Sequence, residues 1–266
     1  NDESKNVLDE FVFTDWETDT SWFDVSEMNM TNFYVASFDD KRVAYASDYL
    51  QKFGYKAVDN LSKADFVLTG VNPPSLDAYR DFHICAGNVS GDNVFDYTKN
   101  ERFAAENAYY TAESAVCIAC QNSDLSLVNS NVLILGYGRI AKALHRFLIP
   151  YTSHITVCAR NGVQRTTAEM NGALAVTLDE LAQQNDFDFV FNTVPHPIIN
   201  ERELRLFKKD ALLVDLASFP GGIDVHFAES LGLNLIVARG LPAKYSPKSA
   251  GETVAKAVIE HMGVTL

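Results

Sequence analysis

The sequence contains little of what marks several large protein classes. Its 4 cysteines among 266 residues show no paired spacing, so neither a disulfide framework nor a Cys/His metal site is predicted. No apolar run approaches the roughly 18 residues of a membrane-spanning helix, and the acidic start does not resemble a secretory signal. We therefore expect a cytoplasmic globular protein with no membrane contact and no metal. Its cysteines are predicted to be reduced core thiols: Cys85, Cys117, Cys120 and Cys158.

Basic charge is also scarce. The chain has 22 Lys and Arg against 35 Asp and Glu, a net charge of −13, which makes nucleic acid an unlikely partner. Residues 1–30 hold nine acidic side chains and one lysine, a net charge of −8, which leaves −5 for the rest. This arm also carries five aromatic side chains, more than a purely solvated tail requires. Two interpretations stay open: the arm packs on its own domain or on a sister subunit of a homo-oligomer, or it docks another protein.

Apolar runs typical of strands alternate with amphipathic segments along the remaining chain, the order expected of parallel βαβ units. Residues 31–120 predict a smaller N-terminal α/β domain for substrate, ending in a linking helix. Its expected elements are strands at 32–37 and 64–68, a helix at 42–53, short elements near 83–86 and 94–97, and a buried helix at 104–119.

Residues 121–266 are more regular and predict a doubly wound, parallel Rossmann domain. A final helix over about 250–262 is placed to cross back onto the first half and close a cleft between the two. The other expected elements are strands at 132–135, 155–158, 173–176, 187–192, 211–216 and 234–237, with helices at 140–148, 178–184, 201–207 and 225–231.

The stretch VLILGYGRIAKAL, residues 132–144, runs from an apolar strand through two glycines into a helix. Gly136 permits the tight turn, and Gly138 lets the backbone approach a pyrophosphate. The first helical residues, Arg139 and Ile140, offer backbone N–H groups to the anion. In this context the turn predicts a dinucleotide site, and a merely close-packed turn is the alternative.

The end of the next strand distinguishes between nicotinamide cofactors. An NAD site usually places an acidic residue there for the ribose 2′-hydroxyl, whereas this chain has Arg160, with Arg165 and Thr166 nearby. Arginine pairs well with a 2′-phosphate, so NADP is expected in preference to NAD. The alternative is an exposed arginine that stacks on adenine.

Three loops follow later strands and are expected to face the nicotinamide, because ligands bind at the carboxyl ends of parallel strands. Residues 192–197 contribute Thr193 and Pro195, and residues 217–222 contribute Ala217 and Ser218. The third loop, residues 239–251, concentrates basic side chains in an acidic protein, which favours an anionic substrate. Its candidate residues are Arg239, Lys244, Lys248 and Ser249.

These motifs together resemble the family of the dipicolinate synthase A subunit. The resemblance covers roughly residues 105–262 and is thin before them, because Ser37 and Phe38 stand where the family usually has two glycines. The motifs that carry it are GYGR from Gly136, CAR ending at Arg160, NTVP from Asn192, DLASFPGG from Asp215, GLPAKYSPKSAG from Gly240, and TAE from Thr111.

The resemblance implies NADP-linked oxidation of 4-hydroxy-tetrahydrodipicolinate, a cyclic imine dicarboxylate of the diaminopimelate pathway, to the dipicolinate of sporulation. It also implies a flavoprotein-like B subunit. Lys244 and Lys248, with Lys41 or Arg42 across the cleft, become candidates to hold the carboxylates. Lys244 also counts among the catalytic candidates, and Thr111 and Ser249 count among the substrate contacts.

Two residues are candidates to move the proton released as the ring becomes aromatic. Glu113 would do so if burial raised its pKa, and otherwise ends a helical salt bridge. His196 lies between two prolines beside the expected nicotinamide, and otherwise caps backbone groups.

Two other functions remain alternatives. One is a D-2-hydroxyacid dehydrogenase-like oxidoreductase, although residues 239–251 lack the catalytic histidine that such an enzyme needs near this part of the site. The other is a non-catalytic NADP-binding regulatory or scaffold subunit.

Overall fold

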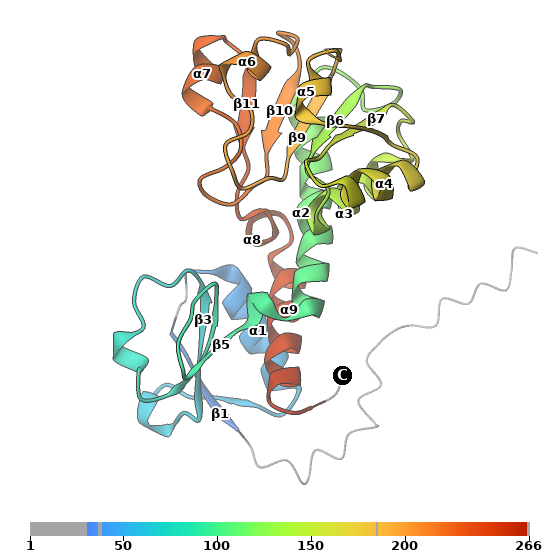
Figure 1. Ribbon diagram of the computed structural model, residues 1–266. Helices are drawn as coiled ribbons and strands as arrows, with labels where there is room; N and C mark the ends of the chain where they lie inside the picture. Colours follow the sequence, from blue (N-terminus) through green and yellow to red (C-terminus); the bar gives the residue numbers. More distant parts are fainter. Residues whose placement is uncertain (1–30, 37–38, 185, 265–266) are drawn as a thin grey trace, which may run out of the picture.

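A computed structural model describes residues 31–36, 39–184 and 186–264. It contains two parallel β-sheets, one near each end of the long helix α2 (Glu101–Asn122), as Figure 1 shows. This arrangement confirms the predicted α/β class with a Rossmann-type sheet and a smaller sheet. The arm expected over residues 1–30 lies outside the described residues.

The smaller sheet has the strand order β2-β1-β3-β4-β5, with every pair parallel. Helix α1 (Lys41–Lys52) covers it by burying Val43, Ala46 and Leu50 against its apolar face. Asp40 begins this helix by accepting a hydrogen bond from the backbone N–H of Arg42. The strands are β1 (Asn32–Val35), β2 (Lys56–Ala57), β3 (Phe66–Val71), β4 (His83–Gly87) and β5 (Val94–Asp96).

The larger sheet has the order β11-β10-β9-β6-β7-β8, again fully parallel. Its order reverses between β6 and β9, the switch point where doubly wound sheets bind ligands. The strands are β6 (Val132–Leu135), β7 (Ile155–Cys158), β8 (Leu174–Val176), β9 (Phe189–Asn192), β10 (Leu212–Asp215) and β11 (Asn234–Val237). The helices are α3 (Arg139–Leu148), α4 (Gly162–Met170), α5 (Leu178–Leu181), α6 (Glu201–Leu204) and α7 (Val225–Ser230).

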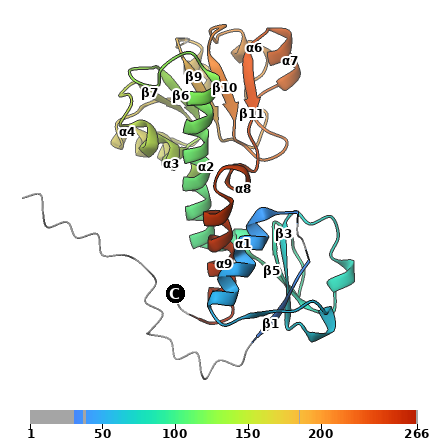
Figure 2. The same ribbon diagram turned by 180° about the vertical axis from the view of Figure 1, so that it is seen from behind.

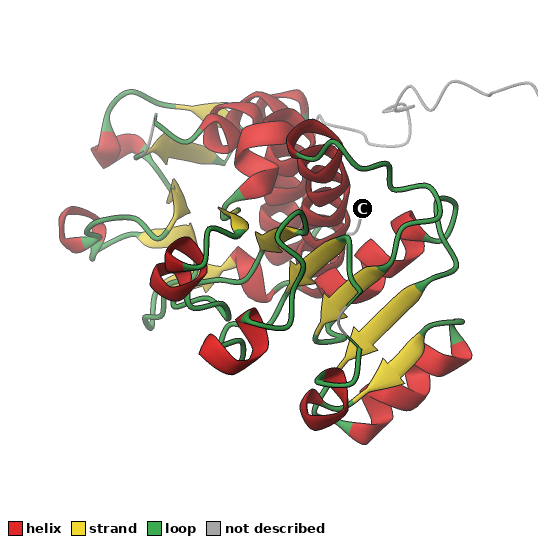
Figure 3. Ribbon diagram, turned by 90° about the horizontal axis from the view of Figure 1, so that it is seen from above, coloured by secondary structure: helices red, strands yellow, loops and turns green. Residues whose placement is uncertain are grey.

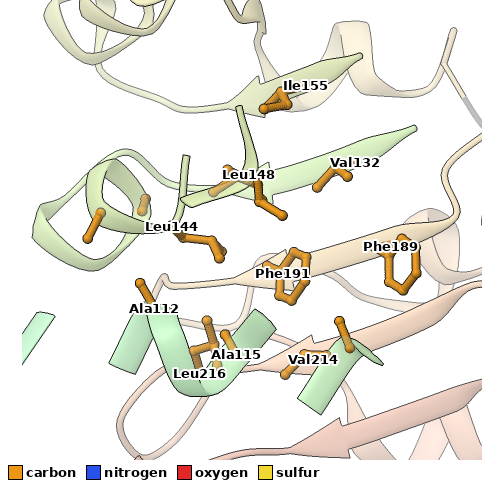
Figure 4. Close-up of a cluster of buried hydrophobic side chains, with 14 of the residues drawn as sticks. Ala112, Ala115, Val132, Leu144, Leu148, Ile155, Phe189, Phe191, Val214 and Leu216 are labelled. Carbon is orange, nitrogen blue, oxygen red and sulfur yellow. The ribbon is translucent and has the colours of Figure 1, made fainter. Parts of the chain in front are cut away.

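The core of the Rossmann domain is built from aromatic and aliphatic side chains of β9 and its neighbours. Phe189 and Phe191 lie on one side of β9 with ring centroids 6.5 Å apart, and both are fully buried. Figure 4 shows them beside Leu144 of α3 and Ala115 of α2. The small residues of α2 therefore let this helix approach the sheet closely.

Two long helices connect the halves. The carboxyl half of α2 packs against the Rossmann core, and its amino half meets α9 (Pro247–His261), which returns from the Rossmann domain to lie along α1 (Figures 1 and 2). At Gly251 the contact with α1 is so close that a Cβ would lie 2.5 Å from the carbonyl oxygen of Arg42. Seen from above, helices flank the strands on both sides (Figure 3).

The structure corrects the expected loop at residues 239–251. Gly240 turns the chain with φ of +65°, and α8 (Leu241–Tyr245) follows, so most of this segment is helical. Its prolines do not break a helix, because Pro242 and Pro247 stand in the first turns of α8 and α9, where a missing N–H costs nothing.

The cysteine prediction is half wrong. All four thiols are free and Cys85 and Cys158 are buried, but Cys117 and Cys120 are exposed. Both lie on the face of α2 that packs against neither sheet nor helix, which is the face carrying exposed Glu113. Among the residues described, every helix is too short or too polar to span a lipid bilayer.

Candidate cofactor and substrate site

The glycine turn between β6 and α3 has the geometry that a dinucleotide needs. Gly136 has φ of +85°, and a Cβ there would lie 2.7 Å from Cγ2 of Val194, so two separate constraints require glycine. Gly138 begins α3 without a side-chain cap, and no atom lies within 4 Å of where its Cβ would stand. The first N–H groups of α3 are therefore open to an anion, which fits a pyrophosphate.

Tyr137, between the two glycines, anchors this turn in the protein. Its hydroxyl lies 2.7 Å from Nδ1 of His145 on α3, and Asn171 donates to it over 3.3 Å. Tyr137 and His145 are each 2% exposed. Burial raises the pKa of Tyr137 and lowers the pKa of His145, so both groups are neutral near pH 7 and can share one hydrogen bond.

Arg160 follows β7 at the edge where an adenosine ribose would lie. Its side chain is exposed and makes no hydrogen bond or ion pair with any described residue. Arg165 has a different role, because it donates to the carbonyl oxygens of Ala159 and Arg160 over 2.8 Å each and so holds the turn. Of these two cations, Arg160 is the one left for a ligand phosphate.

A buried pair, Asn192 and Asp215, ties together the loops that follow β9 and β10. Asn192 is fully buried and Asp215 is 1% exposed, and the amide donates to the carboxylate over 2.7 Å. Asp215 also accepts from the backbone N–H groups of Ala217 at 3.1 Å and Gly222 at 3.2 Å. Asn192 also donates to the carbonyl oxygen of Val194 and accepts from its N–H, both over 3.1 Å. The two loops are thus held rigidly at the carboxyl edge of the sheet.

Of the expected nicotinamide-side residues, Thr193 donates to the carbonyl oxygen of Leu135 over 2.8 Å, which joins its loop to the glycine turn. Pro195 and Ser218 are exposed on their loops, whereas Ala217 is buried beneath Arg239. Arg139 pairs with Glu101 over 2.6 Å at an exposed position, so its backbone and not its guanidinium faces the glycine turn's anion site.

The basic candidates for substrate binding lie at the start of α1, in the last turn of α8 and at the start of α9. Lys41 opens α1, Lys244 lies on α8, and Lys248 opens α9 with Ser249 beside it, all four exposed. The close contact of Gly251 with the backbone of Arg42 brings the starts of α1 and α9 together. The helices α1 and α9, each with an exposed lysine in its first turn, therefore lie side by side.

Arg42 is already engaged within the protein. Its guanidinium pairs with Asp40 over 2.7 Å, and the two side chains are only 13% and 16% exposed. Burial alone would raise the pKa of Asp40, but the hydrogen bonds and charge of Arg42 outweigh it and leave that pKa lowered. Arg42 thus braces the start of α1, and Lys41 is the freer cation.

The candidates for proton transfer are not assembled with one another. Thr111, which was predicted as a substrate contact and not as a proton carrier, is 6% exposed and donates to the carbonyl oxygen of Asn107 within its own helix. Glu113 is exposed on α2, and His196 is exposed on the loop after β9. Neither makes a hydrogen bond or ion pair with another described residue. His196 shares the loop edge with Thr193 and Pro195 and is the better placed of the two.

Sequence reasoning missed a polar cluster where α2 meets α9. Arg102 pairs with Glu106 over 3.1 Å and with Glu260 over 3.0 Å, and Thr253 donates to Glu106. Burial tends to raise the pKa of Glu106, but Thr253 and Arg102 outweigh it and lower that pKa. The Arg102–Glu106 spacing of four residues was a readable helical signal, but the partners on α9 lie about 150 residues away in sequence.

Two hollows lie away from this edge. One of about 600 Å³ adjoins the amino ends of β6 and β7, and one of about 370 Å³ lies beside His261. The candidate site is instead an open face formed by loops. Within the described ranges, no group of three or more His, Cys, Asp or Glu side chains is placed to hold a metal.

Comparison with known proteins first defines a class. A family model for the NAD binding domain of D-isomer specific 2-hydroxyacid dehydrogenases matches residues 99–218. This segment contains α2, the glycine turn and the loop after β9, and it ends at the start of the loop after β10. The match supports the predicted nucleotide-binding domain of an NAD(P)-dependent dehydrogenase over this segment, which is a little under half of the chain.

The particular resemblance is to the A subunit of dipicolinate synthase. The chain is 32% identical to that protein of Bacillus subtilis (strain 168) over 158 residues, which are 59% of this chain and 53% of the relative, or about half its length. The crystal structure of the A subunit of dipicolinate synthase from Bacillus halodurans matches with a TM-score of 0.78 at 20% identity, covering 88% of this chain and 98% of the other. The crystal structure of the dipicolinate synthase A chain from Bacillus subtilis matches with a TM-score of 0.77 at 21% sequence identity. The match covers 89% of this chain and 97% of the other. These matches confirm the predicted resemblance and fold.

Proposed function

We propose that this protein is an NADP-dependent oxidoreductase that converts 4-hydroxy-tetrahydrodipicolinate to dipicolinate. The observation that carries the proposal is the braced carboxyl edge of the Rossmann sheet, where an open glycine turn adjoins loops fixed by Asn192 and Asp215. The sequence likeness to the dipicolinate synthase A subunit supports the choice of substrate.

The residues present fit a nicotinamide dinucleotide. The backbone at Gly136, Gly138, Arg139 and Ile140 would hold the pyrophosphate, and Arg160 would hold a 2′-phosphate. Thr193, Pro195, Ala217 and Ser218 would border the nicotinamide end. When bound, NADP⁺ supplies the hydride acceptor.

The reaction requires the substrate to lose one water, one hydride and one proton. Lys244 and Lys248, with Ser249 and Lys41 across the junction, would hold and orient the two carboxylates. His196 is the proposed proton acceptor, and Glu113 is the second candidate. Positioning of the ring between rigid loops is the main contribution of this chain to catalysis.

The relatives are named as subunits, and by extension we propose a second, flavoprotein-like B subunit for this chain, together with self-association as a homo-oligomer. The exposed face of α2 and the arm at residues 1–30 are the regions left for such contacts.

Cofactor choice is tested by thermal unfolding with NADP⁺ and, separately, NAD⁺. A ligand at about 100 times its dissociation constant stabilises a protein by roughly 2.7 kcal/mol, which such a titration resolves. We expect a much larger shift with NADP⁺ than with NAD⁺ and loss of this difference in Arg160→Ala. Arg202→Ala, which also removes an exposed arginine, is the matched control and should retain it.

Turnover separates this function from its alternatives. The purified protein, with a B subunit where one co-purifies, should reduce NADP⁺ in the presence of 4-hydroxy-tetrahydrodipicolinate. The dehydrogenase match favours D-2-hydroxy acids as a second candidate substrate class. Turnover of those acids alone would replace the proposal, and tight NADP binding without either activity would establish a regulatory subunit.

A further inference from the structure

Phe219 is an exposed aromatic side chain on a loop that several hydrogen bonds hold in place. It is 83% exposed, although both sides of its turn are fixed. Gly221 donates to the carbonyl oxygen of Ser218 over 2.8 Å, and Asp215 accepts from the N–H of Ala217 on the other side. The backbone that carries the ring is therefore fixed, and the ring lies outside the core.

Arg239 supports this ring from behind. Its guanidinium donates to the carbonyl oxygens of Ala217 at 3.3 Å and Pro220 at 3.0 Å, which flank Phe219 on either side. The guanidinium carbon lies 5.7 Å from the centre of the Phe219 ring. One face of the ring thus meets a fixed cation, and the opposite face is open.

The position of this ring in the fold indicates which ligand could bind over its open face. Phe219 follows β10 and lies between the loop after β9 and the chain entering α8. Ile198 and Ile199 donate from their N–H groups to the carbonyl oxygen of Gly222, so the loop carrying His196 adjoins the Phe219 turn. This edge is where the proposed function requires the substrate, because ligands bind at the carboxyl ends of parallel strands.

We propose that the open face of Phe219 is a stacking platform for the flat, doubly carboxylated ring of the substrate as it becomes aromatic. This inference rests on the proposed function and assigns a specificity role to Phe219, a residue that the sequence analysis did not single out as a site residue. A cation behind an aromatic ring draws electron density toward itself, which makes the opposite face less repulsive to a ring that carries two carboxylates.

Such a platform would act on catalysis as well as on affinity. The tetrahydropyridine substrate is puckered, whereas the product ring is planar, so stacking on Phe219 strengthens along the reaction. Interactions that strengthen toward the transition state raise the rate, and those equal in both states do not. Phe219 would therefore favour the aromatising substrate over saturated analogues of equal charge.

The test is calorimetric titration of pyridine-2,6-dicarboxylate into the full-length, NADPH-saturated protein. Phe219→Leu keeps an apolar side chain and removes the ring, and we expect it to weaken binding about fivefold to tenfold. Phe219→Tyr keeps the ring and should bind within about twofold of the wild type. The saturated analogue piperidine-2,6-dicarboxylate should be nearly insensitive to both changes, and Tyr151→Leu, at another exposed aromatic position, is the control.

Three results would overturn the inference. If Phe219→Leu binds pyridine-2,6-dicarboxylate as tightly as the wild type does, Phe219 is not a stacking platform. A weakened NADPH affinity in Phe219→Leu, with the dicarboxylate unaffected, would assign the ring to the nicotinamide. If the wild type does not bind pyridine-2,6-dicarboxylate at all, the inference is also rejected. In each case NADP⁺ reduction by the wild type reports separately on the proposed function.

Discussion

The two sheets differ in how they use polar side chains at the carboxyl ends of their strands. In the smaller sheet these groups satisfy one another: Asp40 pairs with Arg42, and the Asn88 amide donates to the Asn72 amide oxygen over 2.5 Å. In the Rossmann sheet the buried Asn192–Asp215 pair fixes the loops, and other groups are left exposed above it. The polar groups named at the first edge are thus engaged with one another, whereas the second edge leaves polar and basic side chains exposed, as the proposed ligand site requires.

This difference assigns the halves distinct roles. The Rossmann edge carries Arg160, His196 and Phe219 without hydrogen-bond or ion-pair partners for their side chains among the described residues. The smaller domain contributes mainly Lys41 and the surface that α9 clamps through Gly251. Substitutions at the two edges should therefore separate stability from ligand binding.

Asp215→Ala should have the largest effect on stability. It would leave the Asn192 amide and the N–H groups of Ala217 and Gly222 buried without their acceptor. We expect a loss of about 3 kcal/mol in the free energy of unfolding, together with loss of NADP⁺ binding. Urea unfolding measures the first and calorimetry the second. Asp210→Ala, at an exposed position, is the control, and equal stability of the two variants would refute the bracing role.

Arg42→Ala tests the opposite edge. It would leave the part-buried Asp40 carboxylate without its ion-pair partner, and we expect a loss of about 2 kcal/mol in the free energy of unfolding. NADP⁺ affinity at a temperature where the variant is folded should stay within about twofold, because Arg42 belongs to the other domain. Arg80→Ala is a matched exposed control. A large fall in NADP⁺ affinity for Arg42→Ala would erase the distinction between the edges.

A change of pH should have a smaller effect on the free energy of unfolding. Burial lowers the pKa of His145 below its ordinary value of 6.5, so the unfolded chain binds a proton more readily than the folded one. The stability from this group is fully present above pH 6.5 and is lost as the pH falls toward the folded pKa. Stability measured between pH 7.5 and about 5 should decline less steeply in His145→Gln than in the wild type.

His261 offers the corresponding test in the smaller domain. Burial and the neighbouring His83 lower its pKa, and the two Nε2 atoms lie 3.0 Å apart. His261 is more exposed than His145. We therefore expect His261→Gln to reduce the pH dependence of the free energy of unfolding less than His145→Gln does. A larger effect at His261 than at His145 would contradict this ranking.

The sequence predicted elements best where local signals agreed. Strand β6 was predicted to the residue and α3 to within one, because an apolar run, two glycines and a helical pattern coincide there. Helix α4 was missed because its exposed Val163 and Met170 break the amphipathic pattern and only Ala168 is buried. Residues 239–251 were predicted as a loop because they follow a strand, although Pro242 and Pro247 stand in the first turns of two helices.

The site was predictable to the extent that it is local. The glycine turn and Arg160 are read from consecutive residues, and the structure places both at the carboxyl edge. The Asn192–Asp215 pair joins residues 23 positions apart in neighbouring strands, and Arg239 reaches Phe219 from the next strand along. Such partners depend on strand order, which no local pattern reports.

The glycine turn offers the most direct test of the central claim, that the Rossmann edge is a nucleotide site and not merely a close-packed turn. The measurement is the dissociation constant of NADP⁺ for Gly138→Ala beside the wild type, with the free energy of unfolding determined for both. Because a Cβ at Gly138 meets no protein atom within 4 Å, stability should change by less than about 0.5 kcal/mol while binding weakens at least about tenfold. Gly136→Ala, with positive φ and a blocked Cβ position, should instead lose about 2 kcal/mol of stability. Unchanged NADP⁺ affinity in Gly138→Ala would contradict the account.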